Sequence, residues 1–292
     1  MARLSGWFTR HPLWVLVIPL GLVAYFVYGG LLWNFWVSVS DWRGLVPSYS
    51  FRGFDHYARL FSDPVFWTSL KNTAILFFTI PLCILLGLGV AVLLDQGLLG
   101  STVFRNLYLL PFALSFVVTG TIWAWMYNPT SGIINTLLRS IGLGALQGTW
   151  HTSQRTVMGS IILALVWQFS GYAALVLLAG IRSVPEVQIK AAMLEGASKF
   201  RIYRKIVFPQ LRGAIATTIV VVMMYALRSF DFIWVLTGGG PGYASHTLPI
   251  MMYKEAFQAT RFAYGSAIAS VLLVLVLLIL VPYLYRTYRR GK

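Results

Sequence analysis

Six long apolar stretches constrain this chain more than any other feature of its sequence. They cover residues 14–36, 71–95, 105–127, 155–182, 213–236 and 261–286. A helix needs about 20 mainly apolar residues to cross the hydrocarbon core of a bilayer. Lipid offers the backbone no hydrogen-bond partners, so such stretches are expected to form helices rather than isolated strands. The sequence therefore predicts an all-α, polytopic membrane protein with six transmembrane helices.

The composition agrees with this prediction. Of 292 residues, 58% are hydrophobic and only 11% are charged, whereas soluble domains carry about 25% charged residues. The net charge of +15 could indicate nucleic-acid binding, but the Lys and Arg residues lie mainly between the apolar stretches. Positive charge that sets membrane topology is the simpler explanation. The single cysteine, Cys83, permits neither an intrachain disulfide nor a cysteine metal cluster, so we expect it to be buried and expect no metal site.

Loop charge predicts the orientation of the helices. With the N-terminus in the cytoplasm, 14 basic residues lie on the cytoplasmic side and 8 on the other, with Arg228 inside a span. The larger group is Arg3, Arg10, Arg105, the seven Lys and Arg from Arg182 to Arg212, Arg286, Arg289, Arg290 and Lys292. Cytoplasmic loops carry such an excess, so both termini are expected inside. We expect three parts: residues 1–66 with the first helix and an external loop, a core at 67–285, and a basic cytoplasmic tail at 286–292.

A charged segment separates the fourth and fifth apolar stretches. Residues 183–209, which we name the basic loop, carry helix signals: Ser183 and Glu186 have the spacing of a capping box, which predicts a helix over residues 184–194. Glu186 and Lys190 are four residues apart and are expected to pair. Gly196 should end this helix.

A second helical piece is expected after Gly196. Ser198 can cap it, the piece should run through Ile206, and Pro209 either stops it or begins the fifth span. Two short helices joined by a glycine bend would form a compact projection. From the residues alone, this projection either docks on a partner protein or lies on anionic lipid through its Lys and Arg side chains.

The loop also contains a recognisable motif. Ala191-Ala192, Gly196 and, after nine further residues, Ile206-Val207-Phe208-Pro209 resemble the cytoplasmic loop motif of binding-protein-dependent ABC importer permeases. One position departs from it, because Lys190 stands where that family usually has Glu. The resemblance implies a coupling helix that contacts a partner ATPase. The residues implied in ATPase coupling are Glu186, Lys190, Ala191, Ala192, Glu195, Gly196, Ala197, Ile206, Phe208 and Pro209.

Two further segments extend the resemblance to sugar permeases of the maltose type. One is the run from Asp231 to Pro241, and the other is the run from Leu110 to Ser115 with Trp123, Asn128-Pro129 and Gly132 to Asn135. The resemblance implies the first of two permease subunits in a prokaryotic inner membrane. It also implies a second homologous permease, an ATPase dimer and an extracytoplasmic sugar-binding protein as partners. No cofactor is expected on this chain, because ATP and Mg²⁺ would be bound by the ATPase subunits.

Polar residues within the apolar stretches predict the substrate pathway, since such residues are costly in a bilayer. Arg228 and Asp231 share a helix face and could pair with each other or contact substrate. The resemblance places sugar contacts near Asn128, Gly132 and Ser229. The complete predicted pathway set is Asn128, Gly132, Gln168, Tyr172, Tyr225, Arg228, Ser229 and Asp231.

Two other classes of function remain open. An ion-coupled secondary transporter would use buried acidic groups, of which Asp231 is the deepest candidate. A membrane-embedded enzyme would need a nucleophile and a base, but the four histidines are expected to be solvated at span ends or in loops. The TGGGPG run at residues 237–242 lacks the lysine of a phosphate-binding loop and predicts a helix end. No catalytic site is expected on this chain.

Overall fold

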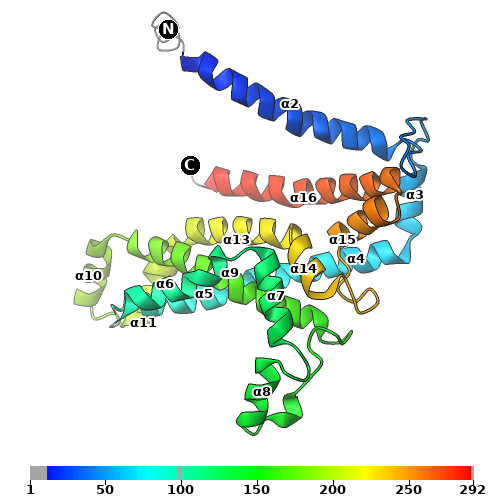
Figure 1. Cartoon of the computed structure of the whole chain (residues 1–292). Coiled ribbons are helices and arrows are strands. Elements are labelled where there is room, and N and C mark those ends of the chain that lie inside the picture. Colours follow the sequence, from blue (N-terminus) through cyan, green and yellow to red (C-terminus); the bar gives the residue numbers. More distant parts are fainter. Residues whose placement is uncertain (1–11, 98–99, 291–292) are drawn as a thin grey trace, which may run out of the picture. The chain divides into compact units, whose positions relative to one another are not determined.

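A computed structural model describes residues 12–97 and 100–290 of the chain, and within them helices form almost all of the regular structure (Figure 1). An isolated antiparallel bridge between Ser40 and Phe51 is the exception. The predicted all-α class is confirmed.

Four residues that entered the predictions lie outside the described residues: Arg3, Arg10, His11 and Lys292. The helices are α2 (Pro12–Ser38), α3 (Asp55–Ser62), α4 (Pro64–Ile75), α5 (Thr79–Asp95), α6 (Ser101–Ala113), α7 (Phe116–Met126), α8 (Ile133–Ser140), α9 (Val157–Arg182), α10 (Glu186–Leu194), α11 (Lys199–Ile202), α12 (Phe208–Gln210), α13 (Arg212–Leu227), α14 (Phe230–Thr237), α15 (Leu248–Tyr253) and α16 (Phe262–Arg290).

Four described helices are long and apolar enough to cross a membrane: Val17–Ser38, Pro64–Asp95, Val157–Arg182 and Phe262–Tyr283. Two bent pairs raise the number to six if each pair is one span. These are Val103–Ala113 with Phe116–Met126, bent by 102°, and Lys199–Gln210 with Arg212–Leu227, bent by 63°. The chain is thus a multi-pass membrane protein with four to six candidate spans.

The third apolar stretch is not the single helix that hydropathy predicts. It breaks between α6 and α7, where Leu114 takes an extended conformation with ψ 144°. Ser115 then begins α7 as its N-cap, and its hydroxyl oxygen accepts a hydrogen bond from the Val118 backbone N–H at 3.3 Å. Such a cap satisfies a backbone donor that a helix start leaves open, so the chain can turn here.

The fifth stretch is divided as well, so it is not one continuous helix over residues 213–236. α13 ends at Leu227, and α14 begins at Phe230. Between them the backbone N–H of Arg228 bonds to the carbonyls of Met224 and Tyr225, and the Ser229 hydroxyl donates to the Ala226 carbonyl at 2.8 Å. These local bonds satisfy backbone groups that a break would otherwise expose.

The chain forms two compact units. The first comprises the described residues up to Asp63 together with Met251–Val274, and the second comprises Pro64–Ile250 with the rest of α16. The predicted boundaries at residues 66 and 285 stay a prediction.

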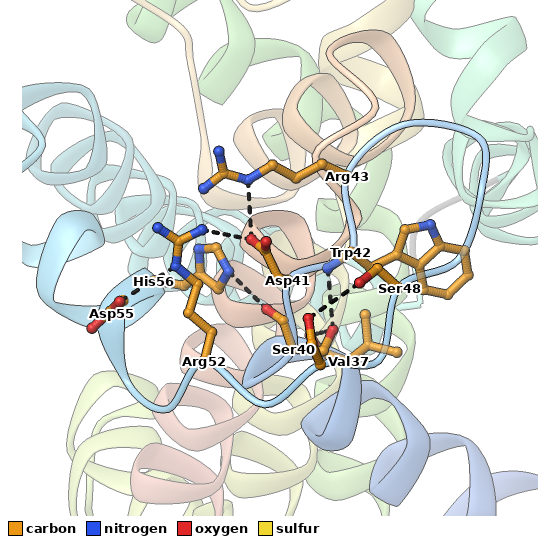
Figure 2. A network of polar contacts seen from close by, with 10 residues as sticks. Val37, Ser40, Asp41, Trp42, Arg43, Ser48, Arg52, Asp55 and His56 are labelled. Carbon is orange, nitrogen blue, oxygen red and sulfur yellow. Dashed lines mark hydrogen bonds and ion pairs between the residues drawn. The ribbon is translucent and has the colours of Figure 1, made fainter.

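In the first unit, a polar network ties down the segment after α2 (Figure 2). Arg52 pairs with Asp41 at 2.6 Å and with Asp55 at 3.3 Å. The His56 ring is buried and bonds to the Ser40 carbonyl at 2.9 Å. Burial lowers the pKa of His56, so the neutral ring is favoured. The expectation that the histidines are solvated is therefore wrong for His56, and it is wrong for His246, which is also buried.

The second unit is built on the packing of α5 against α9. Gly87 allows the close approach, because a Cβ atom there would lie 2.7 Å from the Ala173 Cβ. Small residues at such contacts let helix backbones pack tightly in a membrane. Cys83, also on α5, is fully buried in the apolar core, as predicted.

A polar face of α4 holds the segment that follows α14. The Asn72 amide donates to the carbonyls of Tyr243 and His246 at 3.0 and 2.9 Å. The Thr73 hydroxyl accepts from the Leu248 backbone N–H at 3.1 Å. Gly238 ends α14 with φ 60°, which confirms the helix end predicted for the glycine run.

Candidate functional site

The bend between α6 and α7 opens a cavity in the second unit. This bent-helix pocket has a volume of about 310 Å³ and is lined by Phe112, Leu114, Ser115, Phe116, Val117, Gln168, Phe169, Tyr225 and Asp231. Its residues come from α6, α7, α9, α13 and α14. Its volume lies near the lower end of the range for small-molecule sites, about 300–1,000 Å³.

Gln168 gives the pocket an unusual polar group. Its side chain is 3% exposed, and its Nε2 donates to the Leu114 carbonyl at 3.0 Å. The break at Leu114 thus frees a carbonyl that Gln168 satisfies. The Gln168 Oε1 is buried and has no hydrogen-bond partner among the described residues. A buried acceptor without a partner is costly, and a bound hydroxyl group would remove that cost.

Aromatic side chains make the walls. Phe169 and Tyr225 lie with ring centroids 4.8 Å apart, and Phe116 meets Tyr225 edge-on at 5.8 Å. Phe112 stacks on Tyr172 at 4.9 Å. Asp231 is exposed and contributes a carboxylate. The pocket therefore combines flat apolar faces with the Gln168 acceptor, the Asp231 carboxylate and hydroxyl groups.

The structure brings together only part of the predicted pathway set. Gln168, Tyr225 and Asp231 line the pocket, and Tyr172 supports its wall. Ser229 is buried and its hydroxyl is occupied by the backbone of Ala226. No ion pair joins Arg228 to Asp231 among the described residues, so the suggested pairing is not observed.

Asn128 and Gly132 belong to a loop that follows α7. The Asn128 Oδ1 accepts from the backbone N–H groups of Thr130 and Ser131, each at 3.0 Å, as in an Asx turn. Gly132 packs against the Asn128 backbone, where a Cβ atom would clash. Both residues shape this loop in the structure. Sequence reasoning missed Ser115 and the pocket phenylalanines, although Pro111 before Ser115 is a signal for the bend.

The basic loop folds largely as expected. Gly196 takes a left-handed conformation with φ 77° after α10, and the Ser198 hydroxyl caps α11 by accepting from the Arg201 N–H at 3.4 Å. Lys190 pairs with Glu186 at 3.2 Å. α11 ends at Ile202 and continues as a π-helical turn, η3 (Tyr203–Val207), and Pro209 lies within α12.

The predicted capping box is wrong. α10 begins at Glu186, its N-cap position is Pro185, and no side chain caps it. Ser183 instead ends α9, and its hydroxyl donates to the Gly180 carbonyl at 2.7 Å. A serine beside a helix end can bond backwards or forwards, and the preceding helix supplied the nearer carbonyl.

The outer surface of the basic loop mixes charge with exposed apolar side chains. Leu194 is 90% exposed and Phe200 is 73% exposed. Of the predicted coupling residues, Ala192 is buried and Ala197, Ile206 and Phe208 are half-buried, while those exposed are Glu186, Lys190, Ala191, Glu195, Gly196 and Pro209. Exposed Leu and Phe beside charged residues make this side of the loop a candidate contact surface.

A second cavity lies under the basic loop. This loop cavity has a volume of about 730 Å³, and its lining includes Asp95 and Gln96 from the end of α5, Ile189 from α10, and Ile202 and Tyr203. The Tyr203 hydroxyl donates to the Asp95 Oδ2 at 2.6 Å. Burial and the neighbouring Asp95 raise the pKa of Tyr203 to about 12, so the hydroxyl keeps its proton at neutral pH.

Known proteins share both the sequence and the fold. The chain is 50% identical over 275 residues to a probable ABC transporter permease protein of Pyrococcus horikoshii, covering 94% of each chain. It is 40% identical to a xylose/arabinose import permease protein of Haloferax volcanii, covering 98% of this chain and 90% of that protein. A bacterial alginate ABC transporter, crystallised in complex with an alginate pentasaccharide-bound periplasmic protein, contains a chain with a TM-score of 0.80 and 23% identity, over 99% of both chains. Residues 65–291 match the family described as binding-protein-dependent transport system inner membrane component. The chain therefore belongs to the binding-protein-dependent transport system inner membrane components.

Proposed function

We propose that this chain is a permease subunit of an ATP-binding cassette importer for a sugar or oligosaccharide, forming half of the translocation pore. The family assignment supports the class of transporter. The carbohydrate cargo is supported by the relative named for xylose and arabinose import. Six spans and both termini in the cytoplasm complete the proposed topology.

The observation that carries the proposal is the form of the basic loop. Its inner side is held in an apolar cluster by Ala192, Ile202 and Val207, each at most 9% exposed. Its outer side presents Leu194 and Phe200 among charged residues. A loop whose inner side packs in the core, and whose outer side exposes apolar side chains among charged ones, is suited to transmit force from a partner protein. We assign that partner as an ATPase dimer, which would bind ATP and Mg²⁺.

The bent-helix pocket is the proposed sugar site. Sugar rings present C–H faces that match the Phe116 and Tyr225 rings, and their hydroxyl groups can donate to Gln168 Oε1 and to Asp231. Irregular backbone lining a cavity at a helix break is the usual place for transporter substrates. A second homologous permease would supply the facing half of the pathway, and an extracytoplasmic binding protein would deliver the sugar.

Transport by the reconstituted complex tests the proposal. Proteoliposomes with both permeases, the ATPase and the binding protein should accumulate labelled sugar only with internal ATP, and uptake should persist when ion gradients are collapsed. Uptake that follows an ion gradient without ATP would overturn it in favour of a secondary transporter.

A matched pair of variants tests the pocket. Tyr225→Ala removes an aromatic wall of the pocket and should raise the half-saturating sugar concentration about fivefold, since losing an aromatic contact costs about 1 kcal/mol. Trp125→Ala removes an aromatic side chain that is 72% exposed and does not line the pocket, so it should leave uptake unchanged. Equal effects of the two variants would contradict the assigned site.

A further inference from the structure

One side-chain hydrogen bond fastens the basic loop to a helix far away in the sequence. The Tyr203 hydroxyl donates to the Asp95 Oδ2 at 2.6 Å, across 108 positions of the chain. This distance is typical of a charge-assisted O–H···O⁻ bond, which is about twice as strong as a neutral one. Among the described residues, the other side-chain-to-side-chain hydrogen bonds and ion pairs of the loop join residues between Glu186 and Gln210.

Each of the two residues lies at an end of a helical element. Asp95 is the last residue of α5, and Tyr203 is the first residue of the π-helical turn η3. π-helical turns are rare, and they occur often at functional sites. Both residues also line the loop cavity, so the packing around their hydrogen bond contains a cavity. The hydrogen bond therefore spans a part of the interface where apolar contacts are incomplete.

Two kinds of contact attach the loop to the helices beneath it. Ile202 and Val207 are 3% and 1% exposed and belong to one apolar cluster with Ala91 and Leu94 of α5 and with Leu177 and Ile181 of α9. Apolar contacts of this kind are not directional and can slide. A short hydrogen bond fixes one distance and one direction. The bond to Asp95 thus adds a fixed distance and direction at the end of α5 to the apolar contacts that the loop makes with α5 and α9.

We propose that Asp95 and Tyr203 are positioning residues for energy coupling: their hydrogen bond links movement of the basic loop to α5, and through the tight α5–α9 packing to the transport pathway. This inference rests on the proposed function. The two residues act through the loop, and neither is proposed to contact the sugar or ATP. Without it, a partner ATPase could move the loop while α5 stays behind, and ATP would be hydrolysed without transport.

Sugar transported per ATP hydrolysed is the measurement that tests this, in proteoliposomes containing the complete complex. Tyr203→Phe removes only the hydroxyl, and Asp95→Ala removes the acceptor. Each should lower the transport-to-hydrolysis ratio about three- to tenfold, as expected for loss of a partly exposed hydrogen bond to a charged group. Asp95→Asn retains an acceptor oxygen and should restore most of the ratio. Tyr108→Phe is the matched control, because it removes another phenol hydrogen bond, to Ser170 at 2.9 Å.

The outcomes separate the two proposals. A wild-type complex whose ATPase activity ignores sugar and binding protein would overturn the proposed function, and this inference with it. A coupled wild-type complex in which Tyr203→Phe and Asp95→Ala reduce only the amount of folded protein, at an unchanged ratio, would overturn the positioning role alone. The same conclusion follows if Tyr108→Phe lowers the ratio as much as Tyr203→Phe.

Discussion

Gly87 and Gly89 form a natural matched pair for testing how α5 packs on α9. A Cβ atom at Gly87 would lie 2.7 Å from the Ala173 Cβ, 2.8 Å from the Ala174 N and 2.9 Å from the Ala173 C. Two of these three neighbours are backbone atoms, which cannot rotate away. A Cβ atom at Gly89, two residues along the same helix, meets nothing within 4 Å. Gly87→Ala must therefore separate the helices, and Gly89→Ala need not.

The difference between the two variants isolates the packing cost. Both exchange a helix-interior glycine for alanine and gain up to about 1 kcal/mol of helix propensity, which cancels in the comparison. Overpacking a tight contact costs about 1–3 kcal/mol. At roughly 2–4 °C per kcal/mol for a chain of this size, the two melting midpoints should differ on the order of 5 °C.

Heat treatment of the detergent-purified protein, followed by size-exclusion chromatography of the remaining folded fraction, measures both midpoints under identical conditions. Gly89→Ala should melt at or above the wild-type temperature, and Gly87→Ala should melt below it. If Gly87→Ala proves as stable as Gly89→Ala, the close α5–α9 contact is not what holds the second unit together.

Three further predictions concern other parts of the chain. Burial lowers the pKa of His56 below its ordinary 6.5, so the neutral ring stabilises the fold fully above pH 6.5 and this stability is lost as the pH falls below that value. His56→Gln can still donate to the Ser40 carbonyl, so it should make the melting midpoint depend less on pH between pH 7.5 and 5. An unchanged slope of midpoint against pH would refute this. Gly196→Pro is incompatible with φ 77° and removes the N–H that bonds to Met193, so it should leave the protein inserted but abolish sugar-stimulated ATPase activity of the reconstituted complex, and wild-type stimulation would contradict it. Ser115→Ala deletes the cap of α7 and should cost about 1 kcal/mol of stability, seen as a midpoint lowered by a few degrees, whereas no change would show that the bend does not depend on this cap.

The features that could be predicted from the sequence are those decided by neighbours along the chain. Apolar length predicted the spanning helices, because a bilayer demands it wherever the chain lies. Gly196 and Ser198 acted as predicted, since a left-handed residue and a helix cap require only adjacent backbone. The pair of Glu186 and Lys190 formed because the two side chains share one helix face.

The remaining features depend on distant partners. Hydropathy does not locate the breaks at Leu114 and Arg228, since each break lies inside one long, mainly apolar stretch. The Leu114 break is satisfied by Gln168, 54 positions away. The hydrogen bond between Asp95 and Tyr203 is likewise not predictable from any sequence pattern, because the two residues are 108 positions apart. The capping box failed because α10 begins at Glu186, which leaves Ser183 two positions before the N-cap, and the Ser183 hydroxyl donates to the Gly180 carbonyl of the preceding helix instead.

The polar face of α4 has a mechanical consequence for the bent-helix pocket. Asn72 and Thr73 bond to the backbone of His246 and Leu248, nine and eleven residues beyond the last residue of α14, while the opposite end of α14 begins at the break after Arg228. α14 is thus a short helix that follows a break in the chain at its N-terminal end, and the segment after its C-terminal end is held by hydrogen bonds to α4. Asp231 is the second residue of α14 and lies next to this break, so a tilt of α14 about its C-terminal end would displace Asp231 more than the residues near Thr237. Because Asp231 lines the bent-helix pocket, a change in the angle between α13 and α14 would move one of the pocket's polar groups.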